Sequence, residues 1–219
     1  MRPIEVGLQP YHSRAEKVPG VGSSFGGTSA HISDKPLLSV ENLSAGYAKP
    51  VLGPLSFEVH RGDIISVRGP NGSGKSTLLN ALVGGARIFS GAVRRGEGVR
   101  IAHQQQAALP LDNVPLSGKE LLALTGAEVA GLPEWIARLI KRRLDRLSGG
   151  QRQFLQVWAS LKAPVDVVLL DEPTNNVDPQ GVQHLEGALR TMQPNRAVLL
   201  VSHDQNFLDR ISTRTIRLG

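Results

Sequence analysis

The sequence predicts an α/β fold with a core of buried strands and helices, antiparallel strands before the core, and a small helical lobe inserted into it. Residues 63–68 (DIISVR) form an apolar run typical of a buried strand, and a glycine-rich loop and the helical pattern of residues 77–83 follow it. Two further apolar runs, residues 165–170 and 197–201, are also typical of buried strands. Residues 107–146 instead have helical spacing interrupted by prolines, which indicates the inserted lobe.

Length and composition favour one compact globular domain. A chain of 219 residues, 40% of them apolar, is long enough to bury a full core. No apolar run approaches the ~18 residues of a membrane span, and residues 1–30 lack the apolar core of a signal peptide, so we expect a cytosolic chain. The absence of cysteine excludes disulfides and thiolate metal sites. The net charge of +6, without a long basic run, does not select a class of partner.

The first 36 residues differ from the rest of the chain. Residues 18–30 are rich in Gly and Ser and lack periodicity, so residues 1–36 are predicted to be a flexible tail and residues 37–219 the folded domain. This domain is predicted to begin with a short strand at residues 37–43. Residues 55–60 alternate apolar and polar side chains, which predicts a half-buried antiparallel strand.

The stretch GPNGSGKST at residues 69–77 fits the phosphate-loop pattern, in which a glycine and any four residues precede Gly-Lys-Ser. Gly72 and Gly74 can adopt positive φ, so the backbone curls and successive N–H groups point at phosphate oxygens. The helix that starts near Lys75 adds its positive N-terminal end. Lys75 then reaches the outer phosphates as a point charge, and the Ser76 hydroxyl can ligate Mg²⁺.

Two short strands are expected after the helix of the phosphate loop, at residues 90–95 and 98–103. The glycine pair at residues 84–85 is expected to close that helix. The section ends in three consecutive glutamines, Gln104, Gln105 and Gln106.

The inserted lobe is predicted to contain helices at residues 116–124 and 133–144. The second of these helices is basic, because it carries Arg138, Lys141, Arg142 and Arg143, and Arg146 follows just beyond its end. Such a charge run is usually a solvated face, and a surface that docks a partner is the sharper alternative.

A second anion-binding helix end is predicted at residues 147–153, LSGGQRQ, which lead into the apolar-periodic helix of residues 154–161. Ser148, Gly149 and Gly150 lie at the start of this helix, where a serine cap and free N–H groups favour an anion. A Ser-Gly-Gly turn alone is common, so the prediction of an anion-binding site here depends on the other motifs that accompany it.

Carboxylates and a histidine follow the two remaining core strands. The first strand ends in Asp171 and Glu172, at the sheet edge where open α/β sheets bind ligands; Asp171 suits a metal and Glu172 suits a base. Asp178, followed by a proline, is predicted to cap a helix. The second strand ends in Ser-His-Asp with His203 at its centre, and residues 215–218 are predicted to form a closing edge strand.

Together these motifs resemble the ATP-binding cassette (ABC) ATPase, the nucleotide-binding domain or subunit of ABC transporters. The resemblance covers about residues 37–219, with five separated motifs in the order of that family. It implies a P-loop NTPase (RecA-like) core, an antiparallel β subdomain and an inserted helical subdomain at about residues 107–160. It also implies that two such domains face each other head to tail, with each ATP between the phosphate loop of one and the LSGGQ turn of the other.

The resemblance implies four sets of residues around the nucleotide. Tyr47 would stack on the adenine, although an ordinary surface tyrosine in a turn is the alternative, and Asp178 would lie at the subunit interface. The phosphates would be held by Gly69, Pro70, Asn71, Gly72, Ser73, Gly74, Lys75, Ser76 and Thr77. The γ-phosphate of the opposite subunit's ATP would be contacted by Ser148, Gly149, Gly150 and Gln151.

The same resemblance assigns the catalytic groups and the Mg²⁺ ligands. Glu172 would be the general base, His203 would hydrogen-bond the γ-phosphate, and Lys75 would stabilise charge on the β and γ oxygens. The glutamine that contacts Mg²⁺ and the attacking water is predicted to be Gln106, and a register change of one or two residues would select another of the three glutamines. The Mg²⁺ ligands would then be Ser76, Gln106 and Asp171.

The leading functional hypothesis is an ATPase that drives a conformational cycle as the ATP-binding subunit of a membrane transporter. The resemblance then implies a homodimer or heterodimer on the cytoplasmic face of the membrane, with a separate membrane-spanning permease that docks on residues 107–146. The alternative is a protein similar to the ABC-F translation factors, which act on the ribosome. Residues 171–178 (DEPTNNVD) and 201–208 (VSHDQNFL) are similar to motifs of that group, whereas its second cassette and long charged linker are missing here. Nucleic-acid contact is expected only under this alternative.

Overall fold

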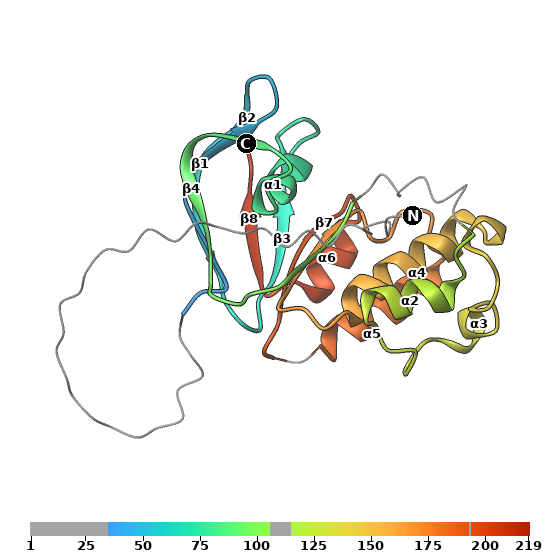
Figure 1. Cartoon of the computed structure of the whole chain (residues 1–219). Helices are drawn as coiled ribbons and strands as arrows, with labels where there is room; N and C mark the ends of the chain where they lie inside the picture. Colours follow the sequence, from blue (N-terminus) through green and yellow to red (C-terminus); the bar gives the residue numbers. More distant parts are fainter. Residues whose placement is uncertain (1–34, 106–114, 193) are drawn as a thin grey trace, which may run out of the picture.

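The computed structural model describes residues 35–105, 115–192 and 194–219 and has a mixed α/β architecture with two sheets (Figure 1). The predicted tail, residues 1–36, lies outside the described residues except for its last two. No helix among the described residues is long and apolar enough to cross a membrane.

The core is a parallel sheet of five strands in the order β5-β6-β7-β3-β8. Its strands are β3 (Ile64–Arg68), β5 (Ile101–Gln104), β6 (Val167–Asp171), β7 (Ala197–Val201) and β8 (Arg214–Arg217). Because the strands are parallel, their carboxyl ends lie along one edge of the sheet, and the loops that follow β3, β6 and β7 meet there. The predicted core strands and the closing edge strand are therefore confirmed, with bounds that differ by up to two residues.

The two faces of the core sheet are covered by different elements, because successive side chains of a strand point to opposite faces. Val167 and Leu169 pack in one hydrophobic cluster with the helix of the phosphate loop, α1 (Lys75–Leu82). Val168 and Leu170 pack in the other cluster, with the helices that cover the second face. These helices are α4 (Gly149–Lys162), α5 (Pro179–Arg190) and α6 (Gln205–Ile211).

A three-stranded antiparallel sheet, in the order β2-β1-β4, lies on the α1 side of the core. Its strands are β1 (Leu38–Gly46), β2 (Pro50–Val59) and β4 (Arg87–Arg95). Each of them is longer than the strand predicted from the sequence. The predicted antiparallel pairing of residues 55–60 is confirmed by the register between β1 and β2.

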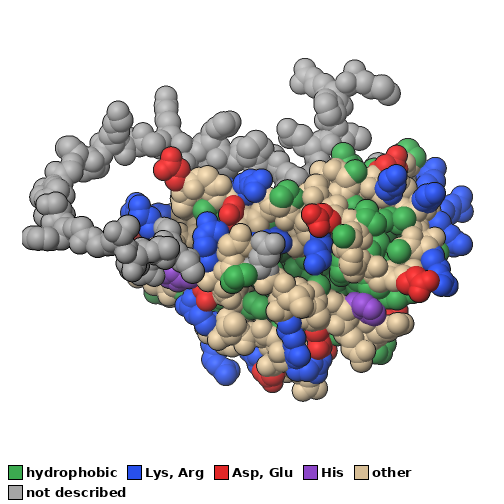
Figure 2. Space-filling model, turned by 90° about the horizontal axis from the view of Figure 1, so that it is seen from below, with side chains coloured by type: hydrophobic (Ala, Val, Ile, Leu, Met, Phe, Trp, Pro, Cys, Tyr) green, Lys and Arg blue, Asp and Glu red, His purple; other side chains and the backbone are tan. Residues whose placement is uncertain are grey.

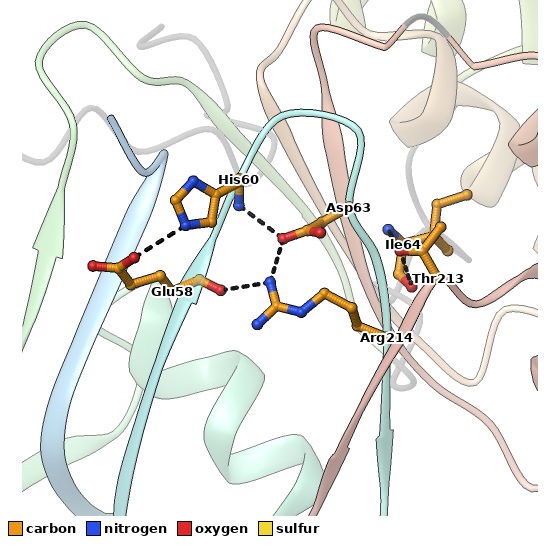
Figure 3. Close-up of polar contacts among 6 residues, drawn as sticks. All are labelled: Glu58, His60, Asp63, Ile64, Thr213 and Arg214. Atoms are coloured by element: carbon orange, nitrogen blue, oxygen red, sulfur yellow. Dashed lines mark hydrogen bonds and ion pairs between the residues drawn. The ribbon is translucent and has the colours of Figure 1, made fainter. Parts of the chain in front are cut away.

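The carboxylate of Asp63 stabilises the turn from the antiparallel sheet into the core sheet by accepting two hydrogen bonds (Figure 3). Its Oδ2 accepts hydrogen bonds from the His60 backbone N–H at 2.8 Å and from Arg214 Nη1 at 2.6 Å. Arg214 also donates to the Glu58 carbonyl at 3.1 Å, and Thr213 Oγ1 accepts from the Ile64 N–H at 2.9 Å. The start of β3 is thereby tied to β8, at the end of the sheet opposite the phosphate loop.

The helical lobe contains α2 (Gly118–Thr125), α3 (Glu134–Ala137) and a short 3-10 helix (Leu144–Arg146) ahead of α4. The predicted helix at residues 133–144 is wrong, because α3 ends after one turn. The chain beyond it instead runs back along the start of α2, where Lys119 N donates to Ile140 O and Leu144 N donates to Leu116 O. The five basic residues that were predicted on this helix are exposed on this irregular segment. Figure 2 shows Lys and Arg side chains gathered at this end of the molecule.

Three aromatic rings join the lobe to α4. The ring of Phe154 lies 5.0 Å from that of Trp135 and 5.7 Å from that of Trp158, centroid to centroid. Phe154 and Trp158 are buried in the core cluster and Trp135 packs against it, so both tryptophans serve packing. This stack holds the first turns of α4 against the lobe.

Candidate functional site

The phosphate loop between β3 and α1 has the conformation that its glycines predict. Gly72 and Gly74 have φ values of +82° and +91°, which only glycine adopts at low cost. A Cβ on Gly69 would lie 2.4 Å from the Leu218 carbonyl oxygen, so a larger residue would push the loop off β8. The loop therefore turns tightly into α1, whose free N–H groups face the carboxyl edge of the sheet.

Within this loop, the cation of Lys75 is held by backbone carbonyls. Its Nζ donates to the oxygens of Gly69 and Pro70, each at 2.9 Å. The Ser73 hydroxyl is buried and has no hydrogen-bond partner among the described residues. A positive charge over a concave run of N–H groups, with an unsatisfied hydroxyl beside it, fits the phosphates of a nucleotide.

Asp171, at the end of β6, lies beside the start of α1. It is 5% exposed, and burial raises the pKa of its carboxyl; a hydrogen bond from Ser76 and the charges of Lys75 and His203 oppose this increase. Its Oδ1 is buried and has no hydrogen-bond partner among the described residues. An unsatisfied carboxylate oxygen next to a hydroxyl is the kind of oxygen pair that Mg²⁺ prefers, so these residues fit the metal.

Glu172 follows directly and has a strained backbone, with φ of +53°. Its side chain is buried against His203: Oε2 accepts from the His203 backbone N–H at 3.1 Å, and Oε1 lies 3.2 Å from Nε2 of the ring. Burial raises the pKa of Glu172, and the hydrogen bond from His203 partly offsets this. The His203 side chain is 64% exposed, so it can reach a ligand at this edge while it contacts the carboxylate.

The LSGGQ turn forms the N-terminus of α4. Ser148 and Gln151 cap each other: Ser148 Oγ accepts from the Gln151 N–H at 3.2 Å, and Gln151 Oε1 accepts from the Ser148 N–H at 3.0 Å. Gly149 is exposed, and a Cβ there would meet none of the described atoms within 4 Å. By contrast, a Cβ on Gly150 would lie 2.1 Å from the Asn176 carbonyl oxygen. One glycine thus faces open space, and the next is packed against the loop that follows Glu172.

Asp178 caps α5, as predicted: its Oδ1 accepts a hydrogen bond from the Gly181 N–H at 2.6 Å. The loop between Glu172 and Asp178 borders a cavity of about 770 Å³, which extends along α5 and α6. Glu172 and His203 also line this cavity, so it opens onto the candidate catalytic residues.

Tyr47, the predicted adenine contact, is 55% exposed at the end of β1. Its hydroxyl accepts a hydrogen bond from Asn80 Nδ2 at 2.9 Å, so its ring stands beside the last turns of α1. Gln105 Nε2 donates to Asn80 Oδ1 at 3.4 Å. Gln104 is buried, and its Oε1 has no hydrogen-bond partner among the described residues. Gln106, the predicted Mg²⁺ contact, lies outside the described residues.

The structure brings the phosphate loop, Asp171, Glu172 and His203 together at the carboxyl edge of the core sheet. Ser148 begins a helix on the opposite face of that sheet from α1. One contact was not expected from the sequence: Gln153 Nε2 donates to the Glu172 carbonyl oxygen at 3.2 Å. No sequence signal singles out this glutamine, because the same helix also carries Gln151 and Gln156.

Comparisons with known proteins agree with this geometry. A protein-family model described as ABC transporter matches residues 52–175. The zinc import ATP-binding protein ZnuC of Jannaschia sp. (strain CCS1) is 34% identical over 198 residues, which cover 84% of this chain and 79% of that protein. The energy-dependent translational throttle protein EttA of Haemophilus influenzae is 32% identical over 196 residues, which cover 84% of this chain but 35% of EttA.

Solved structures show the same fold. The ATP-binding subunit of an ABC transporter superposes with a TM-score of 0.71 at 24% identity, covering 84% of this chain and 86% of that one. A metal-chelate type ABC transporter in an inward-facing conformation gives a TM-score of 0.66 at 26% identity, covering 84% of this chain and 80% of the other. The chain belongs to the ABC transporter family, as an ATP-binding and ATP-hydrolysing domain with the P-loop NTPase fold.

Proposed function

We propose that this chain is the ATP-hydrolysing subunit of a membrane importer, and that two copies clamp ATP between them. The observation that carries this proposal is the placement of two phosphate-binding helix ends. α1 packs on one face of the core sheet and α4 on the other. Each presents free N–H groups that favour an anion. Since Gly149 faces open space, a second copy can bring its own phosphate loop to this end of α4.

Within each site, the loop residues 69–77 hold the triphosphate, and Tyr47 stacks on the adenine. Lys75 leaves the carbonyls of Gly69 and Pro70 and takes the β and γ oxygens, since phosphates are stronger acceptors for a cation. Ser148, Gly149, Gly150 and Gln151 of the second copy approach the γ-phosphate. Asp178 lies at the junction of the two copies.

The proposed hydrolytic residues are those at the carboxyl edge of the sheet. Glu172 orients the attacking water and accepts its proton, and His203 bonds the γ-phosphate. Mg²⁺ would be held by Ser76, Asp171 and one glutamine, for which we propose Gln106. When bound, Mg²⁺ neutralises charge on the β and γ oxygens. The two copies separate after hydrolysis, and this movement is what drives the transporter.

The partner is a membrane-spanning permease, and the chain works at the cytoplasmic face of the membrane with no nucleic-acid contact. Two comparisons support this: the ZnuC relatives are named import ATP-binding proteins and match over most of their length, and a whole transporter of metal-chelate type contains the same fold. The helical lobe, with its exposed basic segment, is the proposed docking region.

A second candidate is an ATPase that acts on the ribosome. It is favoured by the similarity of residues 171–178 and 201–208 to ABC-F motifs and by the match to EttA. The chain spans about a third of the length of EttA, so the greater part of that protein has no counterpart in this match. The importer is therefore preferred.

The experiment is to express the chain together with the membrane proteins of its own gene neighbourhood and to purify it from the membrane fraction. We expect a permease to co-purify and to stimulate ATP turnover, with turnover by the chain alone as the control. ATP-dependent co-sedimentation with ribosomes that Glu172→Gln traps, without any membrane partner, would instead establish the second candidate.

A further inference from the structure

The backbone of Glu172 is held in an unfavourable conformation by three hydrogen bonds. Its φ of +53° is left-handed, a conformation that is unfavourable for a residue with a side chain and persists only where the surroundings hold it. Its N–H donates to Val201 O at 2.9 Å, and its carbonyl accepts from the Asn175 N–H at 3.2 Å. The third bond is the donation from Gln153 Nε2 to the same carbonyl, also at 3.2 Å.

Gln153 provides the side-chain donor among these bonds, and it belongs to the helix whose first residues form the LSGGQ turn. The same helix end touches the loop after Glu172 at a second point. Gly150 leaves no room for a Cβ against the Asn176 carbonyl, and Asn176 also has a positive φ, of +58°. The first two turns of α4 thus contact both Glu172 and the loop that leads to the next helix.

We propose that Gln153 is a positioning residue for Glu172, and that it links the LSGGQ turn of a copy to that copy's own catalytic carboxylate. Gln153 touches no reacting atom; it fixes the Glu172 carbonyl and so keeps the carboxylate against the His203 N–H. A phosphate of the opposite copy at Ser148 and Gly149 pulls on α4, and Gln153 transfers this displacement to Glu172. The inference rests on the proposed role of Glu172 as the base.

The first test is Gln153→Met, which keeps the length of the side chain and removes the N–H donor. We expect kcat for ATP hydrolysis to fall about tenfold, which equals ~1.4 kcal/mol, the order of one hydrogen bond. KM for ATP should stay at the wild-type value, and the melting temperature should fall by no more than the few degrees that one lost hydrogen bond costs. Gln156→Met is the matched control, because Gln156 is half-buried one turn further along α4 and its side chain is not part of the proposed site. A wild-type kcat in Gln153→Met, or an equal loss in Gln156→Met, would overturn the proposal.

The second test is a double-mutant cycle that does not depend on the stability of either variant. Because Gln153 acts through the Glu172 carboxylate, Gln153→Met should cause no further loss of hydrolysis in a Glu172→Gln background, measured over long incubations with labelled ATP. Additive losses would mean that Gln153 acts independently of Glu172 and would contradict the proposal. Glu172→Gln alone should slow hydrolysis at least ~100-fold; wild-type turnover in that variant would refute the role of Glu172 itself, which separates the two failures.

Discussion

Gly149 and Gly150 are neighbours in the sequence, but their surroundings in the fold differ completely. A side chain at Gly149 would meet open space, whereas one at Gly150 would overlap the Asn176 carbonyl oxygen. Only Gly150 is therefore required by the packing of this chain. Gly149 needs to be small only if something from outside the chain, such as the nucleotide of a second copy, comes close to it.

Gly150→Ala should lower the melting temperature of the nucleotide-free protein, because the added methyl must displace the Asn176 backbone. Overpacking of this kind costs about 1–3 kcal/mol, and each kcal/mol lowers Tm by about 2–4 °C in a protein of this size. Gly149→Ala is the matched control and should leave Tm unchanged or slightly raised, since alanine favours a helix. Thermal unfolding measures both variants.

Comparing Gly149→Ala with Gly150→Ala distinguishes a glycine that is needed for folding from one that is needed for activity. Gly149→Ala should nevertheless reduce ATP turnover, because its methyl points to where the opposite γ-phosphate is proposed to bind. A Gly149→Ala variant with wild-type turnover would mean that this face of α4 is not part of a shared site.

At the level of residues, the motifs predicted which side chains gather at the sheet edge, because a phosphate loop and strand-terminal carboxylates have a fixed place in an α/β fold. The positive φ of Gly72 and Gly74 followed from residue type alone. The positive φ of Glu172 did not, because a glutamate is ordinarily right-handed, and the hydrogen bonds that its backbone forms with Val201, Asn175 and Gln153 hold it there.

Among the elements, the core strands and the helices α1, α2 and α4 followed from periodicity, whereas α6 was not predicted, and the longest miss has a tertiary cause. The pattern of residues 133–144 is compatible with a helix, yet its backbone groups bond to the start of α2 at Leu116 and Lys119. Pairing between residues that are 21 and 28 positions apart in the chain does not affect the local periodicity. The basic residues of this segment are consequently spread over turns, which gives the exposed end of the lobe an irregular shape.

Strand β5 carries a histidine that makes the stability of the protein depend on pH. Burial lowers the pKa of His103 from 6.5 to about 4, and its Nε2 is buried with no hydrogen-bond partner among the described residues. The folded state therefore binds its proton less readily than the unfolded state does. The contribution of His103 to the free energy of unfolding is complete above pH 6.5 and is lost as the pH falls from 6.5 through about 4.

His103→Gln should remove this dependence, since an amide does not titrate. The measurement is urea unfolding at a series of pH values between 4 and 7. We expect the difference in free energy of unfolding between wild type and His103→Gln to shrink as the pH falls, with the variant the less pH-sensitive of the two. Parallel curves for the two proteins over this range would show that His103 keeps an ordinary pKa.

On the scale of the whole molecule, the arrangement of layers determines the mode of action. The sequence motifs indicate two anion-binding helix ends, but they do not show that these helices cover opposite faces of one sheet. That fact follows from the alternation of Val167, Val168, Leu169 and Leu170 between the two hydrophobic clusters. Two ends that are separated by a sheet would bind the same phosphate only if they belonged to different copies, which is why the proposed function uses ATP as the link between copies.

The most direct measurement of this claim is the molar mass of Glu172→Gln in solution, by light scattering, with and without ATP and Mg²⁺. Slow hydrolysis should trap the clamped state, so the mass should double when ATP is added, and adding Ser148→Arg should abolish the doubling while ATP binding to the single copy persists. A mass that stays at one chain, or a doubling that Ser148→Arg leaves intact, would contradict a triphosphate shared between the phosphate loop of one copy and the LSGGQ turn of the other.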